Sequence, residues 1–152
     1  DFNIQYVGQS KLNPDELKKI IHGWTYWGSG DSSPFLDFVS EDMCNLVLGP
    51  LQVGGVPFYQ DVTSWCGRSN YETLAAGWVA ASEAQDGSDV GDVSTPAVKV
   101  IGNMVVFEED WKGGPAINGG QPVHEDVVMI IDPATHLVTN VIYGVDKTSI
   151  AP

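Results

Sequence analysis

The chain has 152 residues, of which 43% are hydrophobic, and its 20 acidic side chains outnumber 7 Lys and Arg to give a formal net charge of -13. This length and composition suit one globular domain over residues 1–152 with a single apolar core. A negative field of this size repels phosphate backbones and anionic lipid headgroups, which argues against nucleic acids and membrane surfaces as partners. No apolar run approaches the ~20 residues that a membrane-spanning helix needs.

The first predicted helix follows an extended lead-in over residues 1–12. Asn13 is a good cap, Pro14 suits a first helical turn, and Asp15 and Glu16 favour the positive end of the helix dipole. The apolar side chains that follow recur at helical spacing on one stripe. They are Leu17, Ile20, Ile21, Trp24 and Trp27.

The middle of the chain is predicted to contain further helices and one strand. The predicted elements are a short helix over 34–40, a strand over 44–48, a second short helix over 56–66 and a longer helix over 69–84. Ser69 and Glu72 have the spacing of a capping box at the start of the longer helix. Residues 85–95 are rich in Asp, Gly and Ser, which predicts a surface loop.

The last third of the chain is predicted to form strands. Residues 97–101 and 104–111 read as a hairpin around Gly102-Asn103, a dipeptide typical of a two-residue turn. A Gly- and Pro-rich connection precedes two more strands, over 123–131 and 137–145. Because the helices come first and a run of antiparallel strands comes last, the pattern predicts an α+β fold with helices on one side of a curved sheet.

Three stretches carry a resemblance to a known family. They read Phe-Val-Ser-Glu-Asp-Met at 38–43, Val-Ile-Gly-Asn-Met-Val-Val-Phe-Glu at 100–108 and Val-Val-Met-Ile-Ile-Asp-Pro-Ala-Thr-His-Leu-Val at 127–138. In this order they resemble the ketosteroid isomerase, SnoaL and nuclear-transport-factor-two-like (NTF2-like) superfamily, although the family's common turn Gly is absent from 132–136. The resemblance implies a cone, in which a bent mixed or antiparallel sheet wraps around the N-terminal helices and opens to a pocket.

The resemblance implies two classes of function. The first is a cofactor-independent lyase, isomerase or cyclase that acts on a hydrophobic carbonyl or polycyclic substrate by acid/base catalysis. The alternative is a non-catalytic carrier that binds an apolar small molecule in the same cone. Isomerases of this family carry a basic carboxylate in the strand that corresponds to residues 44–48, and this chain has no acid there. The isomerase mechanism therefore does not carry over.

The candidate catalytic residues are acids, His and Tyr. Strand alternation places Glu125 on one face with Val127 and Met129, and His124 and Asp126 on the other. The full set is His124, Glu125, Asp126, Tyr26, His22 and Glu108. Residues expected to line the substrate pocket are aromatic or flexible, namely Trp24, Trp27, Phe38, Tyr59, Trp78 and Met129. The alternatives are a solvated cluster at a strand end for His124 and plain core packing for the Trp side chains.

The remaining signals bear on metals, cysteines and partners. The acids at 108–110 and 125–126 match no EF-hand or zinc spacing, so neither a metal nor a cofactor is predicted. Cys44 and Cys66 would form one disulfide in a secreted protein or stay as two thiols in the cytoplasm. The acidic composition favours secretion. A homodimer through the outer face of the sheet is the predicted mode of self-association.

Overall fold

The computed structural model describes the backbone of most predicted elements. The described residues are 3–26, 33–48, 51–53, 56–59, 62–83, 93–94, 97–111 and 123–145. Within them, no helix has both the length and the apolar character that crossing a membrane requires.

Three helices and ten strands make up the described chain. In order they are β1 (Asn3–Tyr6), α1 (Pro14–Tyr26), α2 (Ser33–Leu36), β2 (Val39–Leu48), β3 (Leu51–Val53), β4 (Val56–Tyr59), β5 (Val62–Cys66), α3 (Arg68–Glu83), β6 (Val93–Ser94), β7 (Ala97–Ile101), β8 (Met104–Trp111), β9 (Val123–Ile131) and β10 (Val138–Val145).

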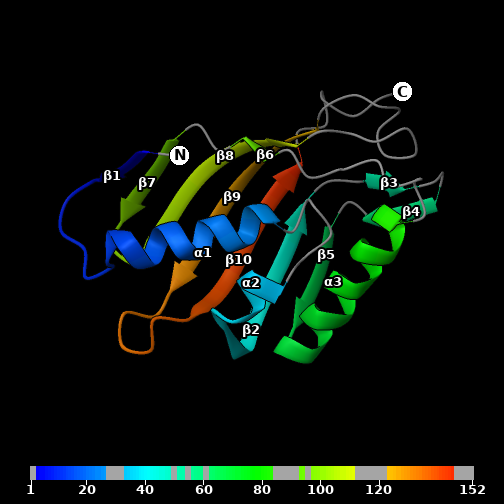
Figure 1. The fold of residues 1–152 in the computed structure, drawn as a ribbon, viewed down its shortest axis with the longest axis horizontal. Helices are drawn as coiled ribbons and strands as arrows, with labels where there is room; N and C mark the ends of the chain where they lie inside the picture. The colour runs from blue at the N-terminus through cyan, green and yellow to red at the C-terminus, as the bar shows by residue number, and fades with distance from the viewer. Residues whose placement is uncertain are drawn as a thin grey trace.

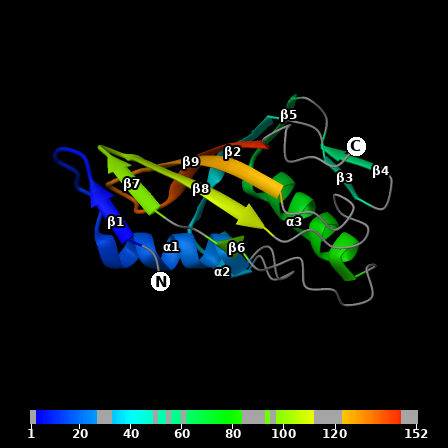
Figure 2. The same cartoon turned by 90° about the horizontal axis from the view of Figure 1, so that it is seen from above.

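The strands form one large curved sheet that does not close. Eight strands belong to it, in the order β1-β7-β8-β9-β10-β2-β5 with β6 beside β8, while β3 and β4 pair separately. Its pairings are antiparallel except β1 with β7 and β10 with β2. Helices α1 and α2 lie across one face, and α3 lies near β2 and β5 (Figures 1 and 2). The α+β cone expected from the sequence is confirmed.

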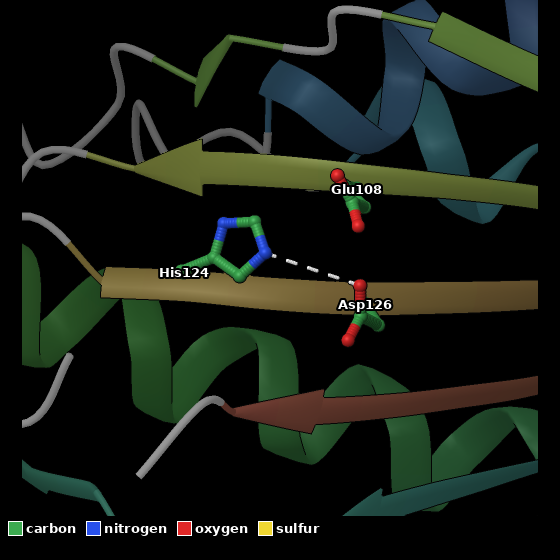
Figure 3. A group of neighbouring side chains, drawn as sticks. All are labelled: Glu108, His124 and Asp126. Carbon is green, nitrogen blue, oxygen red and sulfur yellow. Dashed lines mark ion pairs between the residues drawn. The ribbon is translucent and has the colours of Figure 1, made fainter. Parts of the chain in front are cut away.

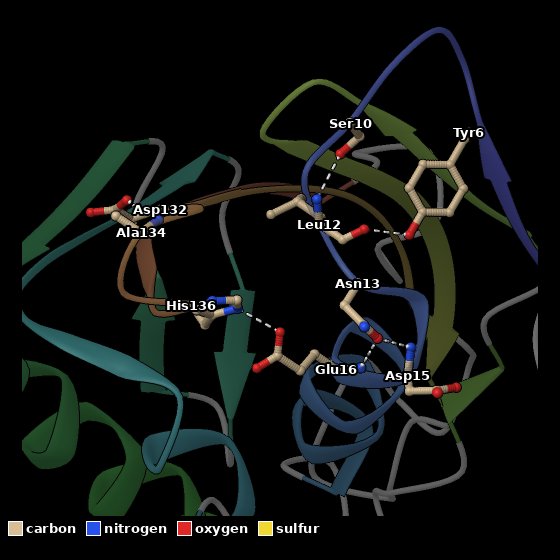
Figure 4. Close-up of polar contacts among 9 residues, drawn as sticks. All are labelled: Tyr6, Ser10, Leu12, Asn13, Asp15, Glu16, Asp132, Ala134 and His136. Carbon is tan, nitrogen blue, oxygen red and sulfur yellow. Dashed lines mark hydrogen bonds and ion pairs between the residues drawn. The ribbon is translucent and has the colours of Figure 1, made fainter.

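Helix α1 begins where its capping residues predict. Asn13 Oδ1 accepts hydrogen bonds from the backbone N–H groups of Asp15 and Glu16, at 2.8 and 3.3 Å (Figure 4). The predicted stripe faces the sheet, and its described members, Leu17, Ile20, Ile21 and Trp24, are all buried. His136 Nδ1 lies 2.6 Å from a Glu16 carboxylate oxygen, which ties the β9–β10 turn to the first turn of the helix (Figure 4).

The predicted short helix over 56–66 is wrong, because this segment forms β4 and β5. Its apolar residues fit a helical spacing, but many are β-branched or aromatic and suit a strand equally well. Pairing of β5 with β2 decides between the two. The helix predicted over 34–40 is also shorter than expected, since Val39 already pairs with Val138 of β10 and begins strand β2.

The C-terminal strands match their predicted bounds closely. The hairpin turns at Gly102, whose φ of 60° is the left-handed value that glycine adopts at low cost. The closing strand begins at Val138, after His136 has taken a φ of 61° at the end of the turn.

Cys44 and Cys66 form a disulfide that links strand β2 to strand β5. The two residues are direct partners in the strand register, with Cα atoms 4.1 Å apart. Of the two states left open by the sequence, the bridged one is present.

Replacing both cysteines, in Cys44→Ala/Cys66→Ala, should lower the free energy of unfolding by about 3 kcal/mol, because the bridge closes a loop of sequence separation 22. Urea denaturation followed by circular dichroism measures this. The wild type treated with reductant serves as the control and should match the variant; equal midpoints for the variant and the oxidised wild type would contradict the prediction.

Candidate active site

Two carboxyl groups interrupt the apolar inner face of the sheet. On β8, Val105, Phe107 and Glu109 point toward the helices, and Val127 and Glu125 do the same on β9, with all five side chains buried. The register of the β8–β9 pair sets Glu109 directly opposite Glu125. Strand alternation and register therefore bring two acids side by side in the core.

The two acids form a hydrogen-bonded pair. Glu109 is 2% exposed and Glu125 6% exposed, and their side chains hydrogen-bond to each other. The indole Nε1 of Trp24 donates to both Glu109 carboxylate oxygens, at 2.9 and 3.0 Å. A hydrogen bond between two carboxyl groups requires a proton on one of them, so this contact favours a pair that carries a single proton.

Burial is the main reason why the pKa of Glu109 is raised to about 7. The nearby charge of Asp110 raises this pKa further, whereas the hydrogen bonds from Glu125 and Trp24 lower it. A carboxyl group with a pKa near neutrality can both accept and return a proton at physiological pH, which suits general acid/base chemistry.

Aromatic rings hold Trp24 in place. Its ring packs edge-on against Phe35, with centroids 5.2 Å apart, and against Tyr143 at 5.7 Å. Phe35 in turn contacts Tyr71 at 6.0 Å. These contacts fix the direction of the indole N–H, so its hydrogen bonds to Glu109 are organised before any ligand arrives.

The described site residues that the sequence predicts lie on both faces of the sheet and on helix α1. Glu125, Trp24 and Met129 are buried on the inner face, and Phe38 packs half-buried against the core. His22 is exposed on α1. The side chains of Tyr26, Tyr59 and Trp78, and all of Trp27, lie outside the described residues.

His124, Asp126 and Glu108 gather on the outer face (Figure 3). His124 Nδ1 is 2.7 Å from an Asp110 carboxylate oxygen, and its Nε2 is 3.9 Å from Asp126. The hydrogen bond with Asp110 is the main cause that raises the pKa of His124. This part of the predicted set is therefore separated from Glu125 by the sheet itself.

One ligand atom from each of Glu108, His124 and Asp126 lies within 4.8 Å of the others, a spacing that a cation could bridge. Exposed acidic groups commonly gather in this way without an ion, and we assign no metal to them. A groove of about 390 Å³ runs beside them, lined in part by Lys99 and Val106. Apolar side chains such as Met104 and Ile142 are also exposed on this outer face, where dimerisation stays a prediction.

The sequence interpretation missed Glu109 and chose its neighbour Glu108. The signal that identifies Glu109 is alternation, since Val105 and Phe107 mark the buried face of β8 and Glu109 continues their series. A glutamate at a core position of a strand is unusual, and burial of this kind marks functional sites more often than surface acids do.

Replacing the buried acid, in Glu109→Gln, should flatten the pH dependence of stability. The pKa of Glu109 rises from its ordinary 4.5 to about 7 on folding, so its stabilising contribution is complete below pH 4.5 and is lost as pH rises through 7. The difference in unfolding free energy between wild type and variant should change across this window by about 3 kcal/mol.

Urea denaturation at a series of pH values measures this difference. Glu41→Gln, which replaces an exposed glutamate on β2, is the matched control and should leave the profile unchanged. A constant difference between Glu109→Gln and wild type from pH 4 to pH 8 would show that Glu109 titrates normally.

Comparison with known proteins identifies the fold. No protein-family model and no curated protein sequence matches the chain. An NTF2-like protein of unknown function from Mesorhizobium loti is similar in structure, with a TM-score of 0.65, 10% identity and coverage of 93% of this chain and 98% of that one. A hypothetical protein of ketosteroid isomerase-like fold from Catenulispora acidiphila, in complex with trimethylamine, has a TM-score of 0.59, 16% identity and 91% coverage of both chains.

A designed protein with a curved β-sheet is similar as well, with a TM-score of 0.62, 14% identity and 90% coverage of both chains. The designed protein has this architecture although it did not evolve for a biological function, so the architecture by itself specifies no activity. The chain has the NTF2-like, ketosteroid isomerase-like α+β fold that its sequence resembles.

Proposed function

We propose that this chain is a cofactor-independent enzyme that moves a proton on the carbon next to the carbonyl group of a hydrophobic small molecule. The observation that carries the proposal is the buried Glu109–Glu125 pair, held by the Trp24 indole on the face of the sheet that the helices cover. Reactions of this type include isomerisation, elimination and cyclisation.

The hydrogen bonds around the pair support a different role for each acid. Trp24 donates to both oxygens of Glu109, which favours the charged form of that side chain. Glu109 then acts as the base that removes the proton beside the carbonyl. Once Glu109 is protonated it no longer accepts the hydrogen bond from Glu125, and the O–H of Glu125 donates to the developing enolate oxygen instead. Return of the proton to another carbon gives isomerisation, and loss of a leaving group from the adjacent carbon gives elimination.

A purely apolar carrier accounts less well for the same residues. Burying a carboxyl group costs free energy that an all-apolar wall would avoid. A carrier of apolar ligands gains nothing from such a cost, whereas a catalyst needs a titrating group in a water-poor site. The acid pair thus favours catalysis over carriage.

The compartment proposed for this activity is extracellular or otherwise oxidising. The Cys44–Cys66 bridge is compatible with secretion. The net charge of -13 adds to the same proposal, as expected for an acidic secreted protein.

The proposed chemistry can be measured with 4-phenylcyclohexanone as a probe. The wild type in deuterated water should accelerate exchange of the hydrogens beside the carbonyl, which proton NMR follows directly. Glu109→Gln and Glu125→Gln should each slow the enzymatic exchange about 100-fold or more, because each removes one partner of the proton transfer.

Glu41→Gln is again the matched control and should exchange the probe at the wild-type rate. Circular dichroism verifies that every variant is folded. Exchange by both pair variants at the wild-type rate would remove Glu109 and Glu125 from the mechanism, and a wild type without any exchange would reject the proposed reaction.

A further inference from the structure

A second pair of titratable side chains lies behind the acid pair, on the outer face of the same two strands. Asp110 follows Glu109 on β8, and His124 precedes Glu125 on β9. The register sets Asp110 opposite His124, just as it sets the two inner acids opposite each other. Because successive side chains of a strand point to opposite faces, the two pairs occupy neighbouring rows and are separated only by the backbone of the sheet.

The outer pair is held by a short hydrogen bond. His124 Nδ1 lies 2.7 Å from a carboxylate oxygen of Asp110, and the two side chains are 31% and 56% exposed. This contact is the main cause that raises the pKa of His124, whereas partial burial lowers it. The imidazole therefore keeps its proton to a higher pH than an isolated histidine does, and while protonated it offsets the negative charge of Asp110.

The described surroundings of this pair are mostly negative. Glu108 on β8 and Asp126 on β9 face His124 (Figure 3), and both raise its pKa further. On β7, Lys99 contributes a positive charge to the groove that these two acids line. Strand β6 places the uncharged Ser94 opposite Asp110. Since His124 contacts Asp110 directly, the proton on His124 determines the net charge at this position near neutral pH.

The charge of Asp110 acts on the acid pair through the sheet. It is one of the causes that raise the pKa of Glu109, although burial is the main one. Neighbouring side chains on opposite faces of a strand place their charged groups roughly 8 Å apart, and a unit charge at this distance changes a pKa by about half a pH unit. Loss of the proton from His124 therefore makes Glu109 harder to ionise.

We propose that His124 is a positioning residue for the inner acid pair: its proton, held by Asp110 on the outer face, keeps Glu109 in the charged form that acts as the base. The inference rests on the proposed function, in which Glu109 removes a proton from the substrate. His124 acts here by its charge and without contact to the substrate, because the sheet lies between them.

Two variants of the outer pair should move the pKa of Glu109 in opposite directions. His124→Gln removes a positive charge and should raise this pKa by about half a pH unit, whereas Asp110→Asn removes a negative charge and should lower it by a similar amount. Both variants remove the ion pair between the two side chains, so a purely structural role would move the pKa of Glu109 the same way in both.

The carbon-13 chemical shift of the Glu109 carboxyl carbon, followed by NMR from pH 4 to pH 9 in protein made with labelled glutamate, measures this pKa. The signal that is missing in Glu109→Gln identifies it. Glu41→Gln on β2 and Lys18→Gln on α1 each remove one exposed charge, and these matched controls should leave the pKa unchanged. His124→Lys keeps a positive charge at the same position and should restore a value near that of the wild type.

Hydrogen exchange of 4-phenylcyclohexanone gives a second measurement on the same variants. The rate rises with pH as Glu109 ionises, so this rise should move to higher pH in His124→Gln and to lower pH in Asp110→Asn. The maximal rate should stay within about twofold of the wild type, because neither side chain touches the substrate.

The carbon-13 titration decides the inference independently of catalysis. Shifts of the Glu109 pKa in the same direction in both variants, or in neither, would overturn it, with circular dichroism verifying that each variant is folded. The proposed function fails separately. It is rejected when the titrations shift in opposite directions but the wild type exchanges no hydrogen, and it survives when Glu109→Gln abolishes exchange while the titrations do not shift.

Discussion

The hydrogen bond from the Trp24 indole to Glu109 joins helix α1 to strand β8 across 85 residues of sequence. It forms only because the inner face of the sheet curves under the apolar stripe of α1. Once Trp24 is in place, its ring packs against Phe35 and Tyr143, and these contacts bring α2 and β10 to the same point. The arrangement of the acid pair thus depends on the packing of the first helix.

The polar residues on the inner face lower the stability of the fold. Glu109, Glu125 and Asn45 stand where Val or Leu would pack at no electrostatic cost. Burial that raises the pKa of Glu109 also makes the charged form unfavourable, so the property that suits proton transfer weakens the fold at neutral pH. A loss of stability of this kind is a common feature of functional sites, and binding of a ligand recovers part of the free energy that is lost.

The same two strands carry a second set of acids on the opposite face. Glu108 and Asp126 alternate with Glu109 and Glu125 along β8 and β9, and they are exposed where the inner pair is buried. Acids that are adjacent in the sequence therefore lie in two different environments, one exposed and one buried. Solvent surrounds the outer ones, whereas the inner ones are buried, and burial raises the pKa of Glu109.

The sequence alone determined the elements whose signals are local. The cap at Asn13, the stripe that follows it and the Gly102 turn each depend on residues a few positions apart, and the structure matches them. Strand alternation also predicted that Glu125 shares one face of the sheet with Val127 and Met129. The tertiary structure decided whether residues 56–66 formed a helix or strands, because the apolar pattern there fits both and pairing with β2 selects one. It also decided that Glu109 meets Glu125 and Trp24, since partners so distant in sequence are brought together only by strand register and helix packing.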